Sequence, residues 1–590
     1  MKWDQLLSKI GLALTTLLIC ILSATLIHAQ SASPVKVLRT GEEISLNGDQ
    51  LPIRWRQWEV DGQTYLGISD VSAQQRLGLE LLSSNDPKVQ PVSWFNEKGR
   101  VYNLAAQHLG KKRYVDLTPI LREITQELAV VGDLLEILTT PVQVQEIRVG
   151  KQSWGERIVI DLNRPLLWQI KQGRDQATLT LPAFTPSSIS KTFPLQSEGT
   201  DPPLLVVKSS QSKQTELEIS LPESLHLQVS TLGNPTRLVI DLRPDALQPR
   251  QIRWQQGIDW RQDYLSVADA QFAVTWLELD PALVNLKPIW SNTQQMEGIA
   301  RLKDMAGENQ VEIAINGGFF NRDTKLPLGA LKREGQWYSS PILNRGAIAW
   351  DNQGSFTMDR LRYQETLYTD TGRTFFLQAL NSGYVQAGIA RYTPAWGVTY
   401  TPLTDEETVV VVENQRVQRL EATTPHQKSP IPIPSNGYLL TIRGRVEFIP
   451  AFPIGTTLQL QNQAFPASFT PYPNILGAGP LLIKNGRVVL NAAGENFSEA
   501  FIQQKAHRSA IALTQAGKLL LVAMGDGVGR KGPTLEEATA ILEQLGAIEA
   551  LNLDGGSSTS LYLGGEIINR PPATTARIHN GIGFETQKFR

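Results

Sequence analysis

The feature that most constrains this chain is the pattern of its N-terminal part. From about residue 35 to residue 250, apolar and polar residues alternate in short runs, such as 54–60 and 65–68, and Gly, Pro, Asn and Asp separate these runs. A period of two places every second side chain on the same face of a strand, and the four separating residue types favour turns. This part of the chain is therefore predicted to consist of β modules.

A short repeat lies within this region. The sequence R-I-V-I-D-L-N-R-P at 157–165 returns as R-L-V-I-D-L-R-P at 237–244, which indicates duplicated β units. The strand pattern ending in V-I-D-L resembles the AMIN-type modules of cell-envelope enzymes, and this resemblance implies a cell-wall polymer as partner or a role in localisation. A generic β-sandwich accessory domain, with the strand recurring by duplication or chance, explains the pattern equally well.

The N-terminus has the order of a secretory signal. Lys2 and Lys9 precede an apolar run at 10–27, which ends at Ala29 before polar residues. A run of about 20 residues also suits an uncleaved membrane anchor. We expect an exported protein that is periplasmic, bound to the cell envelope or secreted. The one cysteine, Cys20, lies inside this run, so the sequence predicts no disulfide and no cysteine-based zinc site.

Charge and length narrow the function classes further. The chain has 56 Lys and Arg against 57 Asp and Glu, so nucleic acid is not an expected partner. Its 590 residues predict several domains, at about 100 to 200 residues each. We divide the chain into a signal or anchor at 1–29, a β-rich accessory module at 35–140, AMIN-like β modules at 141–250 and a further domain at 251–590.

The best-defined elements lie near the C-terminus. Residues 519–524 read as a buried strand, and Thr534 and Glu537 form a T-x-x-E capping box before apolar residues at helical spacing. Gly546 is the expected helix stop, and residues 550–553 read as a second strand. We therefore predict an α+β fold, with mostly β N-terminal modules followed by a mixed α/β domain. Asp554 then lies at the end of a strand, where loops often carry chemistry.

Three groups of residues in that domain suit a polar site. In A-I-N-G-G-F-F at 314–320, a strand runs into two glycines that allow close backbone approach. In L-N-L-D-G-G-S-S-T at 551–559, a carboxylate precedes glycines and hydroxyls. Arginines stand before small or apolar residues at 345, 508 and 577, and guanidinium groups suit phosphate oxygens. Each group alone also fits an ordinary turn or a solvated arginine.

A competing motif occupies residues 527–532. G-V-G-R-K-G fits G-x-G-x-x-G between a strand and a helix, with Asp554 near the distance of a ribose-binding acid. A dinucleotide-binding oxidoreductase is therefore a minor alternative. Export and the presence of a single such unit argue against it.

Taken in order, the motifs resemble the phosphodiester glycosidase family over about residues 251–584. The ordered set is N-G-G-F-F at 316–320, R-G-A-I-A at 345–349, G-A-G-P-L-L at 477–482, H-R-S-A-I-A at 507–512, G-D-G at 525–527 and L-N-L-D-G-G-S-S-T at 551–559. The resemblance implies a hydrolase that cleaves a sugar from a sugar-1-phosphodiester. For an exported protein, the expected substrates are envelope or extracellular glycans.

The resemblance also implies roles for individual residues. Asp554 would act at the anomeric carbon, Arg508 and Arg345 on the phosphate, and Asn316 in the cleft as the fourth catalytic residue. The expected substrate-binding residues are Gly317, Gly318, Gly555, Gly556, Ser557, Arg577 and His507. Neither a metal nor a cofactor is predicted. A reading from a different class, a non-catalytic envelope polysaccharide-binding protein, stays open.

Overall fold

The protein is mostly β. The computed structural model describes residues 34–97, 100–194, 203–209, 214–423 and 429–586, and the signal or anchor predicted at 1–29 lies outside them. Strands account for 51% of the described residues and helices for 10%. The prediction of an α+β fold with a mixed α/β glycosidase domain is therefore wrong. Within the described ranges, no helix is both long and apolar enough to cross a membrane.

The N-terminal region consists of two sheets and two short helices, α2 (Asp70–Leu77) and α3 (Thr118–Ile124). The first sheet has the order β1 (Lys36–Gly41), β4 (Trp55–Val60), β5 (Gln63–Ser69), β9 (Lys112–Asp116), β8 (Tyr102–Leu109), β7 (Val89–Ser93), β6 (Glu80–Leu81). The second has the order β10 (Thr125–Val131), β11 (Leu134–Thr139), β2 (Glu43–Leu46), β3 (Asp49–Leu51). The predicted β character of this region is confirmed.

Two further sheets follow, which we call the sandwich. One has the order β16 (Ala183–Phe184), β12 (Val142–Gln152), β13 (Gly155–Leu162), β21 (Arg237–Arg243), β20 (His226–Leu232). The other has the order β14 (Gln169–Gln172), β15 (Gln176–Leu181), β19 (Thr215–Ser220), β18 (Leu205–Ser209), β17 (Thr192–Phe193). Both copies of the sequence repeat lie in the first of these sheets, in β13 and β21.

The repeated strands pair with each other. In the antiparallel register of β13 and β21, Arg157 lies opposite Asp241 and Asp161 lies opposite Arg237. Arg157 donates to both carboxylate oxygens of Asp241, at 2.7 and 2.8 Å, and Arg237 donates to Asp161 at 2.8 Å. The shared R-x-V-I-D-L pattern therefore encodes two reciprocal ion pairs across one strand pair.

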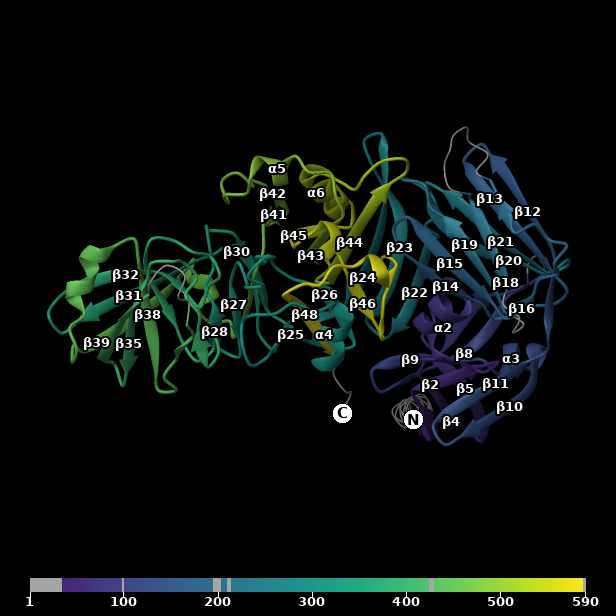
Figure 1. Cartoon of the computed structure of the whole chain (residues 1–590), viewed down its shortest axis with the longest axis horizontal. Coiled ribbons are helices and arrows are strands. Elements are labelled where there is room, and N and C mark those ends of the chain that lie inside the picture. Colours follow the sequence, from purple (N-terminus) through teal and green to yellow (C-terminus); the bar gives the residue numbers. More distant parts are fainter. Residues whose placement is uncertain (1–33, 98–99, 195–202, 210–213, 424–428, 587–590) are drawn as a thin grey trace, which may run out of the picture.

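The C-terminal region, residues 250–586, contains two central sheets that pack face to face at the centre of the molecule (Figure 1). The larger has the order β22 (Arg250–Gln255), β23 (Ile258–Val267), β24 (Ala270–Leu279), β44 (Leu519–Gly527), β43 (Arg508–Thr514), β45 (Ala547–Asn552), β41 (Leu481–Lys484), β42 (Arg487–Val488). The smaller has the order β25 (Val284–Trp290), β48 (Asn580–Thr586), β26 (Ile313–Asn316), β46 (Leu561–Leu563), β47 (Glu566–Ile567).

Helices cover the outer faces of these two sheets. Ala538, Ile541 and Leu542 of α6 (Leu535–Gln544) share a buried cluster with alternate residues of β43 and β44. On the other side, α4 (Leu302–Glu308) packs on the smaller sheet. Because residues 519–524 of β44 are buried on both faces, they form a continuous apolar run without alternation. A short helix, α5 (Glu499–Ile502), completes the described α-helices of this region.

The predicted strand, helix and strand near the C-terminus are confirmed, including the capping box of Thr534 and Glu537. Their arrangement explains why the predicted fold class is wrong. β43 lies between β44 and β45 and is antiparallel to both, so α6 does not connect neighbouring strands of a parallel sheet. The helical pattern is correct for one segment, but it does not extend to the domain.

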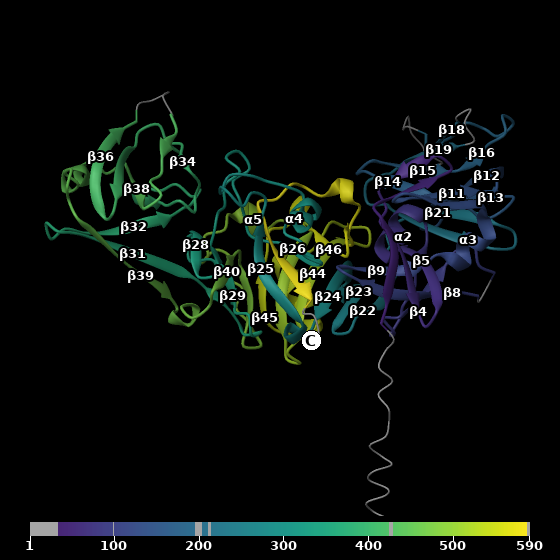
Figure 2. The same cartoon turned by 90° about the horizontal axis from the view of Figure 1, so that it is seen from below.

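Residues 362–465 form a separate lobe beside the two central sheets, drawn in green in Figures 1 and 2. Its sheet has the order β36 (Arg416–Ala422), β35 (Thr408–Glu413), β38 (Gly437–Arg443), β33 (Gly388–Tyr392), β32 (Thr374–Leu380), β31 (Arg362–Thr369), β39 (Leu458–Phe465), and β34 (Thr399–Tyr400) pairs with β37 (Ile431–Pro432). A connecting sheet has the order β28 (Gln336–Ser339), β27 (Leu331–Arg333), β40 (Asn474–Gly477), β29 (Gly346–Trp350), β30 (Phe356–Arg360).

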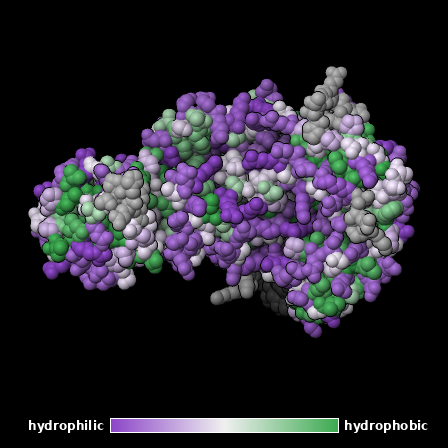
Figure 3. Space-filling model, in the orientation of Figure 1, coloured by the Kyte–Doolittle hydropathy of each residue, from purple (hydrophilic) through white to green (hydrophobic). Residues whose placement is uncertain are grey.

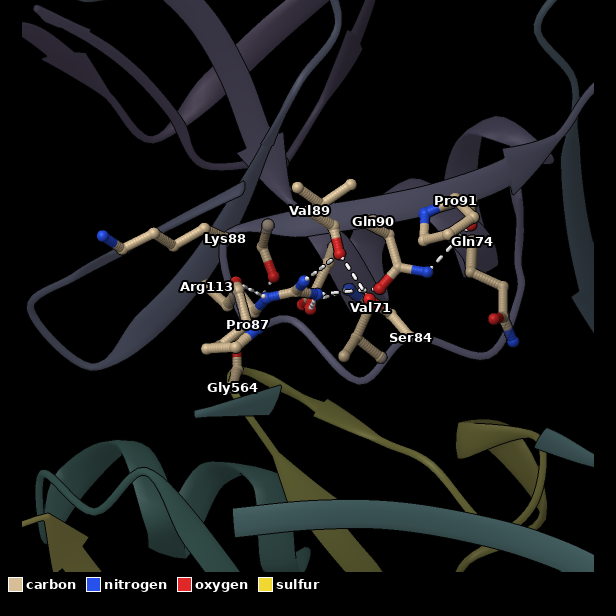
Figure 4. A network of polar contacts seen from close by, with 12 residues as sticks. Val71, Gln74, Ser84, Pro87, Lys88, Val89, Gln90, Pro91, Arg113 and Gly564 are labelled. Atoms are coloured by element: carbon tan, nitrogen blue, oxygen red, sulfur yellow. Dashed lines mark hydrogen bonds and ion pairs between the residues drawn. The ribbon is translucent and has the colours of Figure 1, made fainter. Parts of the chain in front are cut away.

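The N-terminal region contacts the C-terminal region through polar groups. Arg113 is fully buried, where it contacts Asp70 at 3.1 Å and donates to Gln90 at 2.8 Å, and Gly564 of the β46–β47 turn lies close by (Figure 4). Lys112 donates to the Gly564 carbonyl at 2.8 Å. The bond from Lys112 crosses between the two regions, whereas Asp70 and Gln90 belong, like Arg113, to the N-terminal region.

Candidate active site

The candidate site lies at the edge where the two central sheets meet. Strand β26 ends at Asn316 and β45 ends at Asn552, whereas β43 begins at Arg508. Since β43 runs antiparallel to β45, the start of one strand and the end of the other share an edge. This topology brings His507, Asn316 and Asp554 together from segments far apart in the sequence.

Asn316 holds the backbone of Asp554. Its Nδ2 donates to the Asp554 carbonyl at 2.6 Å, and the Asp554 N–H donates to the Gly317 carbonyl at 2.9 Å. The Asn316 Oδ1 accepts from the Ser509 hydroxyl at 2.7 Å and from the Ser560 N–H at 3.0 Å. Asn316 is fully buried, so its side chain positions Asp554 and ties the two sheets together.

The glycines of both motifs are required by close packing. A Cβ on Gly318 would lie 2.1 Å from the Gly477 carbonyl, and one on Gly317 would lie 2.2 Å from Asn580 Oδ1. The Gly318 N–H donates to the same Asn580 oxygen at 2.7 Å. Gly556 has a φ of 63°, which favours glycine. These glycines therefore let three loops approach the Asp554 backbone.

The Asp554 carboxyl is the group best suited to chemistry. Burial raises its pKa to about 6, while hydrogen bonds from Ser558 and Gly555 and the positive charge of Arg322 act in the opposite direction. The Gly555 N–H donates to Asp554 Oδ1 at 3.0 Å. A carboxylate whose pKa lies near neutral pH is suited to act as a base or nucleophile.

His507 belongs to a polar network next to the Asp554 loop. Its Nε2 lies 3.1 Å from Asp526 Oδ2, and its Nδ1 lies 3.2 Å from Arg570 Nη1. Arg570 also donates to the Gly556 carbonyl at 3.1 Å. Although burial acts to raise the pKa of Asp526, His507 and other donors hold it below its ordinary value. With Nε2 donating to Asp526, Nδ1 accepts from Arg570.

Two predicted arginines face backbone carbonyls. Arg508 is 1% exposed, stacks over the Phe501 ring at 5.1 Å and donates to the carbonyls of Gln504 and Pro533. Burial lowers the pKa of Arg508 to about 10. Arg345 lies over Phe497 at 4.0 Å and donates to two carbonyls at 3.3 Å. Phe319, Phe497 and Phe501 form an aromatic cluster against which both guanidinium groups pack.

The remaining predicted residues lie on the loops around Asp554. Ser557 is half-buried in the short helix η4 (Gly556–Ser558), and its carbonyl accepts from Ala576 at 2.8 Å. Arg577 is exposed, and it forms neither a hydrogen bond nor an ion pair with any residue that the structure describes.

Sequence reasoning missed two arginines of this site, Arg322 and Arg570. Arg322 follows the N-G-G-F-F motif by one residue, and Arg570 precedes two prolines in a loop. Arg322 could have been predicted, because it lies beside a glycine motif. Arg570 could not have been predicted, because its place in the site depends on the packing of the 569–572 loop against His507.

A protein carboxylate already uses a backbone N–H of the glycine loop at 527–532, which argues against dinucleotide binding there. The Gly532 N–H contributes to the hydrogen bonds that lower the pKa of Asp526. The Gly532 N–H therefore donates to a carboxylate, whereas a bound pyrophosphate would need that N–H as its own donor.

Comparison with known proteins agrees with the predicted resemblance. Residues 406–585 match the sequence model of the family described as phosphodiester glycosidase. No curated protein matches the chain. A crystal structure of a hypothetical protein from Synechocystis is 42% identical, covers 94% of this chain and all of its own, and has a TM-score of 0.86.

A second solved structure is the catalytic domain of zebrafish N-acetylglucosamine-1-phosphodiester alpha-N-acetylglucosaminidase, auto-inhibited by its pro-peptide. It is 10% identical, with a TM-score of 0.29, and the match covers 70% of this chain and 89% of that domain. The AMIN resemblance of residues 141–250 stays a prediction. Residues 406–585 therefore carry a phosphodiester glycosidase domain, as the ordered motifs predict.

Proposed function

We propose that this protein hydrolyses the bond between the anomeric carbon of a sugar and a phosphodiester. Water adds to the anomeric carbon, the bond from that carbon to the phosphate oxygen breaks, and a phosphate monoester leaves. The observation that carries this proposal is Asp554, a carboxylate with a raised pKa on a loop held by Asn316 and surrounded by basic side chains.

In this proposal each residue acts on the charge that develops next to it during the reaction. At pH 7 a carboxyl group with a pKa of about 6 is mostly ionised, so Asp554 acts on the anomeric carbon as nucleophile or activates water. A departing phosphate needs anion stabilisation more than a proton, and Arg322 and Arg570 are the cations near the Asp554 loop. Arg345 and Arg508 stabilise the loops of the candidate site.

We further propose export and a glycan of the envelope or extracellular space as substrate, supported by the leader-like sequence at 1–29. The AMIN resemblance supports a cell-wall polymer as partner of residues 141–250. An uncleaved leader would anchor the protein to the membrane.

The test is sugar release from a panel of sugar-1-phosphodiesters by the full-length protein, with products identified by mass spectrometry. Release by the wild type and by Glu549→Gln, a control at the far end of β45, but not by Asp554→Asn, is the expected result. Glycan binding without any release by the wild type would instead support a non-catalytic binder.

A further inference from the structure

The sandwich lies directly against the loops of the candidate site. Strand β14 packs on the short helix η5 (Pro572–Thr574), which follows Arg570. On a neighbouring loop, Glu223 lies 3.7 Å from Lys531, which belongs to the loop after β44. Two separate contacts therefore join the sandwich to the loop that carries Arg570 and to the loop that follows Asp526 at the end of β44.

Each contact brings a basic side chain of the sandwich toward the site. Arg174 lies on the turn after β14, is exposed, and has neither a hydrogen bond nor an ion pair with any described residue. His226 begins β20 three residues after Glu223 and is half-buried. The charges of His226 and Asp526 act on each other, as do those of Arg174 and Arg570.

The pairing of Arg174 with Arg570 is the informative one. Burial is the main reason that the pKa of Arg570 is lowered, and the like charge of Arg174 lowers it further against the pull of Asp526. Two guanidinium groups repel each other when no anion lies between them. Their approach across a domain boundary is stabilised when an anionic ligand binds both.

The sandwich packs through β14 on α2 of the N-terminal region, and contacts away from the site fix that region to the two central sheets. The buried Glu566 carboxylate lies 3.1 Å from Arg76 of α2 and 2.6 Å from Lys303 of α4. Backbone hydrogen bonds join Ser84 to Gln251 at 2.9 Å and Arg253 to Ser84 at 2.7 Å. The wall formed by the sandwich is thus set before any ligand binds, and binding there requires no domain closure.

From this arrangement we propose that Arg174 and His226 of the sandwich form, with Arg570, the second wall of the substrate cleft and bind the phosphate of the diester. The substrate then lies between two domains, with the sugar toward Asp554 and the phosphate toward the sandwich. This inference rests on the proposed function and assigns the N-terminal modules a direct role in substrate binding.

The test uses the full-length protein with Arg174→Ala, His226→Ala and Arg174→Lys. Lys208→Ala is the control, because Lys208 lies on β18, three strands from β14 in the same sheet. We expect Arg174→Ala to raise KM about 10-fold with kcat nearly unchanged, the loss typical of one charge-assisted contact. Arg174→Lys should recover part of the loss, and Lys208→Ala should match the wild type.

Titration with inorganic phosphate by calorimetry gives a readout that needs no turnover. We expect Arg174→Ala and His226→Ala to weaken phosphate binding, with unchanged thermal unfolding midpoints. Phosphate affinity and KM that stay at wild-type values in both variants, or a wild type that binds no phosphate, would overturn the inference. If no diester is cleaved but phosphate binding still depends on Arg174, the proposed reaction is contradicted, whereas the proposed phosphate-binding role of the sandwich is supported.

Discussion

The substitution Asp554→Asn tests two effects of this carboxylate, its contribution to kcat and its effect on the free energy of unfolding. Asparagine has nearly the same shape, and the backbone contacts to Asn316 and Gly317 do not involve the side chain that changes. A general base contributes about 100- to 10,000-fold in rate. We therefore expect kcat to fall by at least about 100-fold.

The same substitution should make the protein more stable at neutral pH. The pKa of Asp554 is about 6 in the folded protein against an ordinary value of 3.8, mainly because of burial. The folded state then holds the proton more tightly, so its stability falls as the pH rises from about 4 through 6. At 1.36 kcal/mol per pKa unit, ionisation of Asp554 costs the fold at most about 3 kcal/mol at pH 7.5.

The assay is thermal unfolding of both proteins between pH 3.5 and 7.5, together with sugar release. Asp554→Asn should unfold at a higher temperature at pH 7.5, and the difference should vanish toward pH 3.5. For the wild type, kcat/KM should rise through pH 6 and then level off. A variant that is less stable at every pH, or that keeps its activity, would refute the assignment of a strained, functional carboxylate.

Further substitutions test the supporting contacts. Asn316→Ala removes three hydrogen bonds and should cost about 2–4 kcal/mol in unfolding free energy, measured by denaturant titration, together with a loss of kcat. Arg508→Lys should lower the unfolding midpoint more than it changes KM, because its donors bind carbonyls; a raised KM at unchanged stability would contradict this. Arg570→Ala should show the reverse, a raised KM with a small change in midpoint. Glu566→Gln should loosen the N-terminal region by about 1.5–3 kcal/mol, seen as faster proteolysis between the regions.

Much of the local structure could be predicted from the sequence. The capped helix after Thr534 and the strands on either side follow from residue spacing and capping chemistry, and the structure confirms them. The overall class could not be obtained the same way. A strand such as 519–524, apolar at every position, looks alike in a parallel sheet and in a layer buried between a helix and a second sheet.

The candidate site was predictable in part. Asp554, Asn316 and His507 do come together, because strand ends carry their motifs to one edge. The orientation of a guanidinium group was beyond the sequence, since a strand-start arginine such as Arg508 can point to a ligand or to a neighbouring carbonyl. The approach of the sandwich to Arg570 depends on docking between regions about 400 residues apart, which no local pattern encodes.

The central claim is that the carbon–oxygen bond of a sugar phosphodiester is cleaved at Asp554. Hydrolysis in water enriched in oxygen-18, with mass analysis of both products, tests it most directly. The account predicts the label in the released sugar, none in the phosphate monoester, and no release by Asp554→Asn. Label in the phosphate would mean that the phosphorus–oxygen bond breaks instead, and the proposed reaction would be contradicted.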